Sequence, residues 1–366
     1  MIQAAREVLA ADAELWLALG GLAVGLAFGA VITRTNYCAM GALADVHNFG
    51  DTRRFRAWIL ASATALAGTQ LLALAGIVDL SRSMYLAPTL NWFGNIAGGV
   101  IFGFGMVFAG GCPSRNLARA GAGDLRALVT LLVLGIAAYA TIGGLLAPPR
   151  AALEGATSIG LRPAATQSLA DLLAAVLPVS ASRLSVGLSL LLALAALAYV
   201  AASAAFRASP LHILSGLGVG LCVVAGWAVT GLAFDEMATR PLPPVSLTYV
   251  RPAGDTLEWL QRFTAAPVPG FGVASVLGAL LGALAVSVWR GQFRVQTFAD
   301  AGDTRRSLGG AVLMGLGGVM AMGCTVGQSL TGVSTLALGS FLTFGAIVLG
   351  GRWGLVVLER RILAGA

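Results

Sequence analysis

Two cysteines 212 positions apart, Cys112 and Cys324, are the residues whose side chains are best placed to contact a substrate. Each one ends a glycine-rich apolar run of fifteen residues, 98–112 and 310–324, and a short polar stretch follows it. Eight of the fifteen positions are identical in the two runs, which indicates two copies of an internal repeat. A thiol suits a polarizable sulfur atom better than a hard oxyanion, and its thiolate binds soft metals or attacks a disulfide sulfur.

A third cysteine, Cys38, follows the first apolar stretch in a similar setting. Asn36 is expected to cap a short helix that contains Cys38. Cys222 lies inside an apolar run and is expected to fill space, as buried free cysteines often do. The four cysteines lack the C-x-x-C spacing of zinc and thioredoxin sites, and we predict no metal site and no cofactor.

The residues around the two repeated cysteines could bind an anion. Two apolar helices are predicted to break, one at Gly111–Cys112 and the other at Gly323–Cys324. The helix that begins after each break would present free backbone N–H groups to an anion. Arg115 is either a cytoplasmic anchor or an attractor for an anion, and the aligned Asn116 and Gln328 are either caps or ligands. The predicted substrate-binding residues are Cys38, Cys112, Cys324, Gly111, Gly323, Asn116, Gln328 and Arg115.

Composition places these residues in a membrane. Of the 366 residues 57% are hydrophobic and 11% charged, with a mean hydropathy of +0.85, and charge-free runs recur at the length that crosses a bilayer. We predict an all-α integral membrane protein with about nine transmembrane helices and short broken helices at its centre. The predicted spans are 15–33, 57–78, 94–111, 125–147, 184–206, 212–234, 272–289, 308–323 and 334–350.

The arginines predict the orientation. With the N-terminus outside, fifteen of the 23 basic residues, all of them Arg, fall in inner segments. The positive-inside rule therefore predicts an outer N-terminus and a cytoplasmic C-terminus, and the net charge of +7 then reports orientation and not nucleic-acid binding.

This orientation makes the two copies run in opposite directions. We predict one transmembrane domain, 1–366, with a first repeat at 15–147, a connector helix at 184–206 and an inverted second repeat at 212–350, a construction common in transporters. The loops 148–183 and 235–271 are predicted to lie outside and to carry short surface helices. The middles of the predicted spans contain no Asp or Glu. The sequence therefore offers no carboxylates that could relay protons or sodium ions through the membrane.

At these residues the sequence resembles the YeeE/YedE family of bacterial sulfur-transport membrane proteins. The stretches that carry the resemblance are Tyr37–Ala42, Gly111–Pro113 and Gly323–Gln328. The resemblance implies a nine-span inverted repeat with short helices plugging its centre. It also implies that thiosulfate passes between Cys38, Cys112 and Cys324 through hydrogen bonds to their S–H groups.

We therefore predict a transporter, not an enzyme, that imports thiosulfate or a similar sulfur anion across a bacterial inner membrane. Its predicted partners are the lipid bilayer and a cytoplasmic sulfur-carrier protein. One alternative is a membrane-embedded sulfurtransferase or thiol oxidoreductase that passes sulfane sulfur through a cysteine persulfide. Transport of a selenium compound, or more weakly of a metal ion, also stays open.

Overall fold

The computed structural model describes residue 9 and residues 12–234 and 242–365. Within these residues, eight helical stretches are long and apolar enough to cross a membrane, so the predicted all-α, multi-pass membrane fold is confirmed. They are Ala13–Phe49, Arg53–Leu74, Gly94–Gly121, Leu125–Ile142, Ala181–Ala201, Pro210–Leu232, Phe271–Trp289 and Leu338–Ala364.

The predicted span at 308–323 is the one that does not meet this criterion by itself. It forms the second half of α15 (Ala301–Met320), whose first turns carry Asp303, Arg305 and Arg306. These charges lower the mean hydropathy of the helix, although its later residues pack on α5 (Gly99–Phe108) and α7 (Leu125–Ile142). The count of nine spans stays a prediction.

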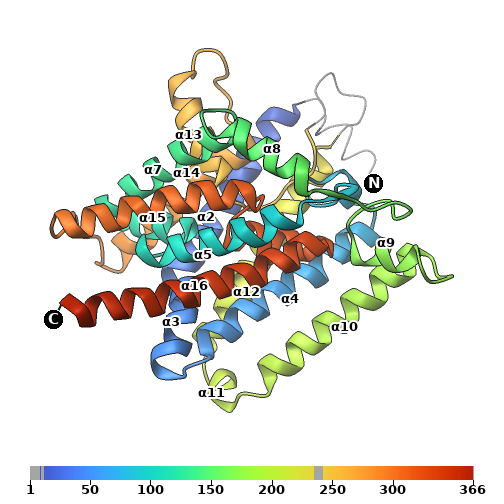
Figure 1. Cartoon of the computed structure of the whole chain (residues 1–366), viewed down its shortest axis with the longest axis horizontal. Coiled ribbons are helices and arrows are strands. Elements are labelled where there is room, and N and C mark those ends of the chain that lie inside the picture. The colour runs from blue at the N-terminus through green and yellow to red at the C-terminus, as the bar shows by residue number, and fades with distance from the viewer. Residues whose placement is uncertain (1–8, 10–11, 235–241, 366) are drawn as a thin grey trace.

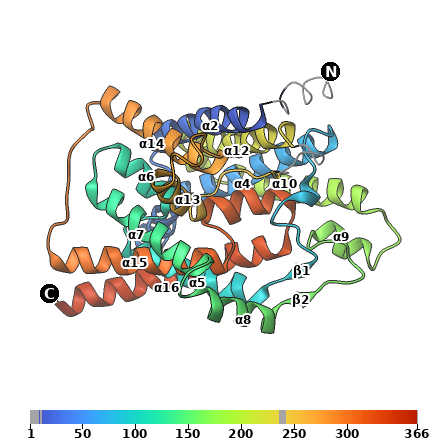
Figure 2. The same ribbon diagram turned by 90° about the horizontal axis from the view of Figure 1, so that it is seen from above.

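The long helices pair across the two halves of the sequence. α2 (Ala13–Thr35) packs on α14 (Phe271–Trp289), and α12 (Pro210–Leu232) packs on both α4 (Arg53–Leu74) and α2. Likewise α5 packs on α16 (Leu338–Gly365) and α15 on α7. Figure 2 shows α2, α12 and α14 on one side of the molecule and α5 and α15 on the other. These exchanged partners are what an inverted repeat would produce, and the repeat itself remains a prediction.

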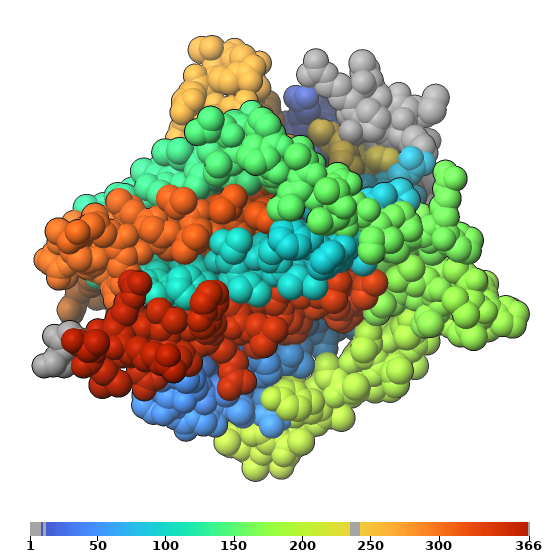
Figure 3. Space-filling view, in the orientation of Figure 1, coloured from blue at the N-terminus to red at the C-terminus, as the bar shows by residue number. Residues whose placement is uncertain are grey.

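Glycine allows the closest of these approaches. A Cβ atom on Gly105 of α5 would lie 2.8 Å from the carbonyl oxygen of Gly310, and a Cβ on Gly317 of α15 would lie 2.6 Å from that of Gly98. The two contacts are equivalent under the 212-residue offset between the cysteine runs. Small residues let helices approach this closely in a membrane, and Figure 3 shows α15, α5 and α16 as adjacent bands on one face.

Short helices occupy the breaks between the long ones. α3 (Ala39–Phe49) follows α2, the π-helical turn η2 (Gly94–Gly98) precedes α5, and α6 (Pro113–Gly121) follows it. After α15 the chain restarts at Thr325 and continues through η3 (Gly327–Gly332) and η4 (Val333–Thr335), all of it buried. The helical restarts predicted after Cys112 and Cys324 are therefore present.

The long loops carry short helices, as predicted. They contain α8 (Ala147–Thr157), α9 (Leu169–Ala174) and α13 (Arg251–Gln261), whereas residues 235–241 of the second loop lie outside the described part of the chain. The remaining elements are η1 (Leu80–Arg82), the antiparallel strands β1 (Thr89–Leu90) and β2 (Ile159–Gly160), α10 (Ala181–Ala201) and α11 (Ala204–Arg207). The strands and α9 lie at the end of the molecule opposite the C-terminus (Figure 2). In Figure 1 α10, the predicted connector, runs along the edge of the bundle.

Candidate functional site

The three predicted cysteines occupy the same local structure. Each lies two residues after a residue with left-handed backbone, Asn36 (φ 55°), Gly110 (φ 71°) or Met322 (φ 59°), and directly before the first residue of a new helix. In each case a backbone N–H bonds back to the carbonyl five residues earlier, as in a Schellman turn: Tyr37 to Ile32, Gly111 to Met106 and Gly323 to Gly318. The chain thus ends one helix, turns, and starts the next at the cysteine.

One sequence-based assignment is wrong at this point. Asn36 does not cap the helix that follows; it ends α2 in the left-handed conformation, which asparagine tolerates better than most residues. Cys38 itself is the N-cap of α3, and its Sγ accepts a hydrogen bond of 3.3 Å from the backbone N–H of Gly41. The thiol has the position that serine or aspartate usually takes at a helix start.

Backbone donors also surround Cys324. Its Sγ accepts a hydrogen bond of 3.3 Å from the N–H of Gly327, and the N–H groups of Tyr249 and Val326 are also directed at it. Cys112 differs, because its Sγ lies 3.2 Å from Ser114 Oγ. The predicted association of thiols with helix starts is therefore observed. At Cys38 and Cys324, backbone N–H groups of the new helix donate to the sulfur atom.

The three cysteines converge in the centre of the protein. Their exposed fractions are 7% for Cys38, 1% for Cys112 and 0% for Cys324. Tyr37, also buried, lies near all three thiols, and Cys112 lies near both Cys38 and Cys324. The structure thus brings together residues from three separate breaks in the chain.

Two arginines lie close to Cys38. Arg115 and Arg54 both interact electrostatically with its sulfur, and Arg54 Nη1 lies 2.8 Å from the position of a Cβ on Gly41. Arg54 pairs with Asp45 at 3.3 Å, whereas Arg115 has no carboxylate partner within ion-pair distance among the described residues. Arg115 is therefore available to an anion beside Cys38, and sequence reasoning missed Arg54.

The amide side chains of Asn116 and Gln328 close the breaks. Asn116 Nδ2 donates to the carbonyl oxygens of Gly111 (2.9 Å) and Cys112 (3.3 Å). Gln328 Nε2 donates to the carbonyl of Ala321, and its Oε1 accepts from Ser340 Oγ at 2.6 Å. Asn116 thus binds the Gly111 carbonyl in the turn after α5, and Gln328 binds a carbonyl at the end of α15. Asn116 Oδ1 is buried without a partner, so only this residue of the pair has an atom left for a ligand.

Gly111 and Gly323 permit the turns beside the thiols. Gly111 has φ 147°, a conformation that a side chain rarely adopts, and a Cβ there would lie 2.8 Å from Arg115 Cγ. A Cβ on Gly323 would lie 3.2 Å from Gln328 Cγ. Their observed role is to let the backbone pass close to neighbouring side chains.

The turn before Cys112 is held by an ion-pair cluster at the end of α6. Arg119 donates to the Gly110 carbonyl at 3.1 Å and pairs with Asp124 at 2.7 Å, and Arg126 also bonds to Asp124, at 3.1 Å. Burial opposes ionisation of Asp124, but the hydrogen bonds from Arg126 and Arg119 outweigh it and hold the pKa of Asp124 below its usual value.

Polar side chains from two long helices hold the buried restart after Cys324. From α4, Trp58 Nε1 donates to Ser329 Oγ (2.8 Å) and Gln70 Nε2 to the Ser334 carbonyl (2.9 Å). From α12, Trp227 Nε1 donates to Ser334 Oγ at 3.1 Å. These bonds satisfy irregular backbone at membrane depth, which is tolerated only inside protein or beside a cavity.

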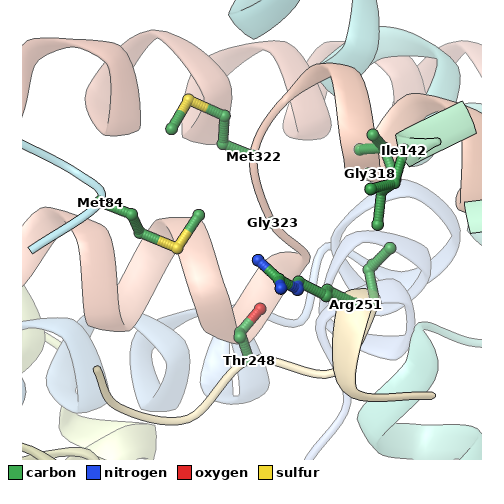
Figure 4. A pocket seen from close by; sticks show the side chains of 9 residues that line it. Met84, Ile142, Thr248, Arg251, Gly318, Met322 and Gly323 are labelled. Carbon is green, nitrogen blue, oxygen red and sulfur yellow. The ribbon is translucent and has the colours of Figure 1, made fainter. Parts of the chain in front are cut away.

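A cavity of about 160 Å³ reaches this centre and is drawn in Figure 4. Its wall includes Gly323, directly before Cys324, and the guanidinium of Arg251 points across it toward Met84. Arg251 lies at the start of α13, and its side chain is 70% exposed and 3.6 Å from Asp255. The lining residues are Met84, Ile142, Thr248, Val250, Arg251, Gly318, Val319, Met322 and Gly323.

The loop that supplies Arg251 and Thr248 was not predicted to contact the substrate. The available signal was a cation at the start of a short helix in that loop, Arg251–Pro252. Cys222 is buried in α12, and within the described ranges no group of three or more His, Cys, Asp or Glu residues is placed to hold a metal ion.

The chain is similar to known proteins over most of its length. The chain is 29% identical over 354 residues to the thiosulfate transporter TsuA of Spirochaeta thermophila, covering 93% of this chain and 99% of that protein. It is 28% identical to the thiosulfate transporter TsuA of Escherichia coli, covering 91% and 92%. A shorter match, 33% identical over 109 residues, links 29% of the chain to 25% of the probable transporter YedE of Escherichia coli. The family model for sulphur transport matches residues 34–353, and this protein therefore belongs to the sulphur transport family.

Proposed function

We propose that this protein imports thiosulfate across the bacterial inner membrane, with its N-terminus outside and its C-terminus in the cytoplasm. The observation that carries the proposal is the convergence of Cys38, Cys112 and Cys324 around Tyr37, together with a cavity whose wall includes Gly323, the residue before Cys324. Two relatives that match over most of their length are thiosulfate transporters, which supports this substrate. Inside, a sulfur-carrier protein would receive it.

The groups along this route are suited to an anion with one soft end. Arg251 would attract it into the cavity, where Met84 and Met322 offer polarizable thioethers. The anion would then pass Cys324, Cys112 and Cys38 in turn, and Arg115 and Arg54 would attract it at the inner end. Because thiols are weak hydrogen-bonding groups, each contact is reversible, and the substrate is not trapped.

A second candidate function has one specific observation in its favour. Arg115 and Arg54 lie beside Cys38 and favour its thiolate, whereas burial and the neighbouring Cys112 oppose it. That thiolate could attack the sulfane sulfur of thiosulfate, forming a cysteine persulfide and releasing sulfite. Transport of the intact anion is the better supported function, because three buried thiols in succession exceed what one nucleophile requires.

Uptake of thiosulfate labelled separately at each sulfur atom tests the proposal. Cells that make this protein should accumulate the sulfane and the sulfonate label equally, and cells carrying the empty vector should accumulate neither. Accumulation of the sulfane label alone would establish the persulfide reaction in place of transport. Selenosulfate in the same assay tests the selenium alternative, because preferred uptake of that anion would reassign the substrate.

A further inference from the structure

Several buried hydroxyl groups around the central cysteines have no hydrogen-bond partner. Among the described residues these include the phenol groups of Tyr37 and Tyr249 and the hydroxyl of Thr325. All three residues are nearly inaccessible to solvent, at 7%, 0% and 2%. Buried polar side chains are nearly always paired, so three unpaired hydroxyls in one region require a physical reason.

All three lie beside the thiols. Tyr37 lies near Cys112, Cys38 and Cys324. The phenol group of Tyr249 lies near Cys222 and Cys324, and its own backbone N–H is directed at the Cys324 sulfur. Thr325 directly follows Cys324 and begins the restarted helix. The unpaired donors therefore lie near the thiols of the proposed route.

The aromatic ring of Tyr249 is fixed by packing. It stacks on Phe28 of α2 with ring centroids 5.2 Å apart and an interplanar angle of 27°. A fixed ring holds its hydroxyl in one place, so the missing partner does not reflect a freely turning side chain. An unpaired buried hydroxyl destabilises the fold, and a passing ligand would remove that cost while it is bound.

We propose that the hydroxyls of Tyr37, Tyr249 and Thr325 bind the oxygen end of the transported anion while the cysteines contact its sulfur end. This proposal rests on the function proposed above. Thiols alone replace little of the hydration that sulfonate oxygens lose in a buried path, whereas neutral hydroxyls donate strong hydrogen bonds to a charged acceptor. The route would then recognise both ends of a sulfur oxyanion.

Single substitutions that remove only the hydroxyl test this assignment. Tyr37→Phe, Tyr249→Phe and Thr325→Val keep nearly the same shape, and Tyr199→Phe is the control, since Tyr199 lies in α10 beneath Arg56. The measurement is the initial rate of labelled thiosulfate uptake at concentrations below half-saturation. We expect a roughly 10- to 100-fold loss for each path variant, the value of one hydrogen bond to a charged group, and no loss for the control.

Thermal stability of the purified variants separates this role from a structural one. Because the removed hydroxyls have no partner, Tyr37→Phe and Tyr249→Phe should unfold at or above the wild-type temperature while transporting poorly. Wild-type uptake rates in both Phe variants would overturn the assignment and leave the proposed function intact. A lower unfolding temperature in both would also overturn it, by revealing structural hydrogen bonds. Absence of uptake by the wild type would refute the proposed function itself.

Discussion

Adjacent glycines in α15 give a sharp test of the close contact between α5 and α15. A Cβ on Gly310 would lie 2.5 Å from the backbone nitrogen of Ala109 and 2.7 Å from the carbonyl oxygen of Gly105, whereas a Cβ on Gly309 would meet nothing within 4 Å. The two positions share the same helix and nearly the same depth. Substitution of each by alanine should therefore change stability in opposite directions.

The magnitudes follow from two opposing effects. Alanine in place of a helical glycine stabilises a protein by about 0.4–1 kcal/mol, chiefly because the unfolded chain loses freedom. At position 310 the new methyl group would press on backbone atoms, which cannot rotate away, and such overpacking typically costs about 1–3 kcal/mol. Gly309→Ala should thus be neutral or stabilising, and Gly310→Ala should be destabilising by roughly 1–2 kcal/mol.

Thermal unfolding of purified protein in detergent, followed by the folded fraction that elutes in size-exclusion chromatography, measures the difference. Gly310→Ala should unfold at a lower temperature than wild type, and Gly309→Ala at the same temperature or higher. Equal behaviour of the two variants would refute the packing of α5 against α15 described here. Gly98→Ala, which would meet Gly317 and Ala321 backbone at 2.7 Å, should resemble Gly310→Ala if the two contacts are equivalent.

Three further substitutions probe other parts of the site. Asp124→Asn should lower stability at neutral pH by roughly 1–2 kcal/mol, because the ion pairs to Arg119 and Arg126 weaken. The pKa of Asp124 is lowered in the folded protein, so its stabilising contribution is complete above a pH of about 4 and is lost as pH falls further. Melting curves over this pH range should show wild type and variant converging in acid, and a constant difference would contradict the assignment. Arg251→Gln should raise the thiosulfate concentration for half-maximal uptake with an unchanged melting temperature, since its side chain is largely exposed; unaltered uptake kinetics would exclude it from the route. Trp58→Phe should lower the melting temperature, because the hydrogen bond to Ser329 is lost. A wild-type melting temperature in this variant would show that the hydrogen bond does not stabilise the fold.

The local structure at the thiols could be predicted from the sequence because it is encoded locally. The aligned runs ending at Cys112 and Cys324 predicted two helix breaks followed by helical restarts, and both are observed. The same reasoning failed at Asn36, because asparagine favours both a helix N-cap and the left-handed end of a helix. The choice depends on the backbone before it, where Tyr37 N–H bonds to the Ile32 carbonyl.

The surroundings of the thiols could not be predicted because they come from distant parts of the chain. Tyr249 and Cys324 are 75 positions apart, and the backbone donor that joins them leaves no sequence pattern. Arg54 stands among the basic residues at the start of α4, and only the folded chain brings it close to Cys38. Long-range packing, not residue type, decides which polar groups share the buried centre.

Thiosulfate-dependent growth and label uptake in a bacterium without its own thiosulfate transporter measure whether the three central thiols form the transport route. The panel comprises wild type, Cys38→Ala, Cys112→Ala, Cys324→Ala and, as a matched buried control, Cys222→Ala. We predict that wild type and Cys222→Ala support uptake, while each of the other three abolishes it without loss of folded protein in the membrane. Uptake that survives all three changes, or that Cys222→Ala impairs equally, would contradict a route formed by the three central thiols.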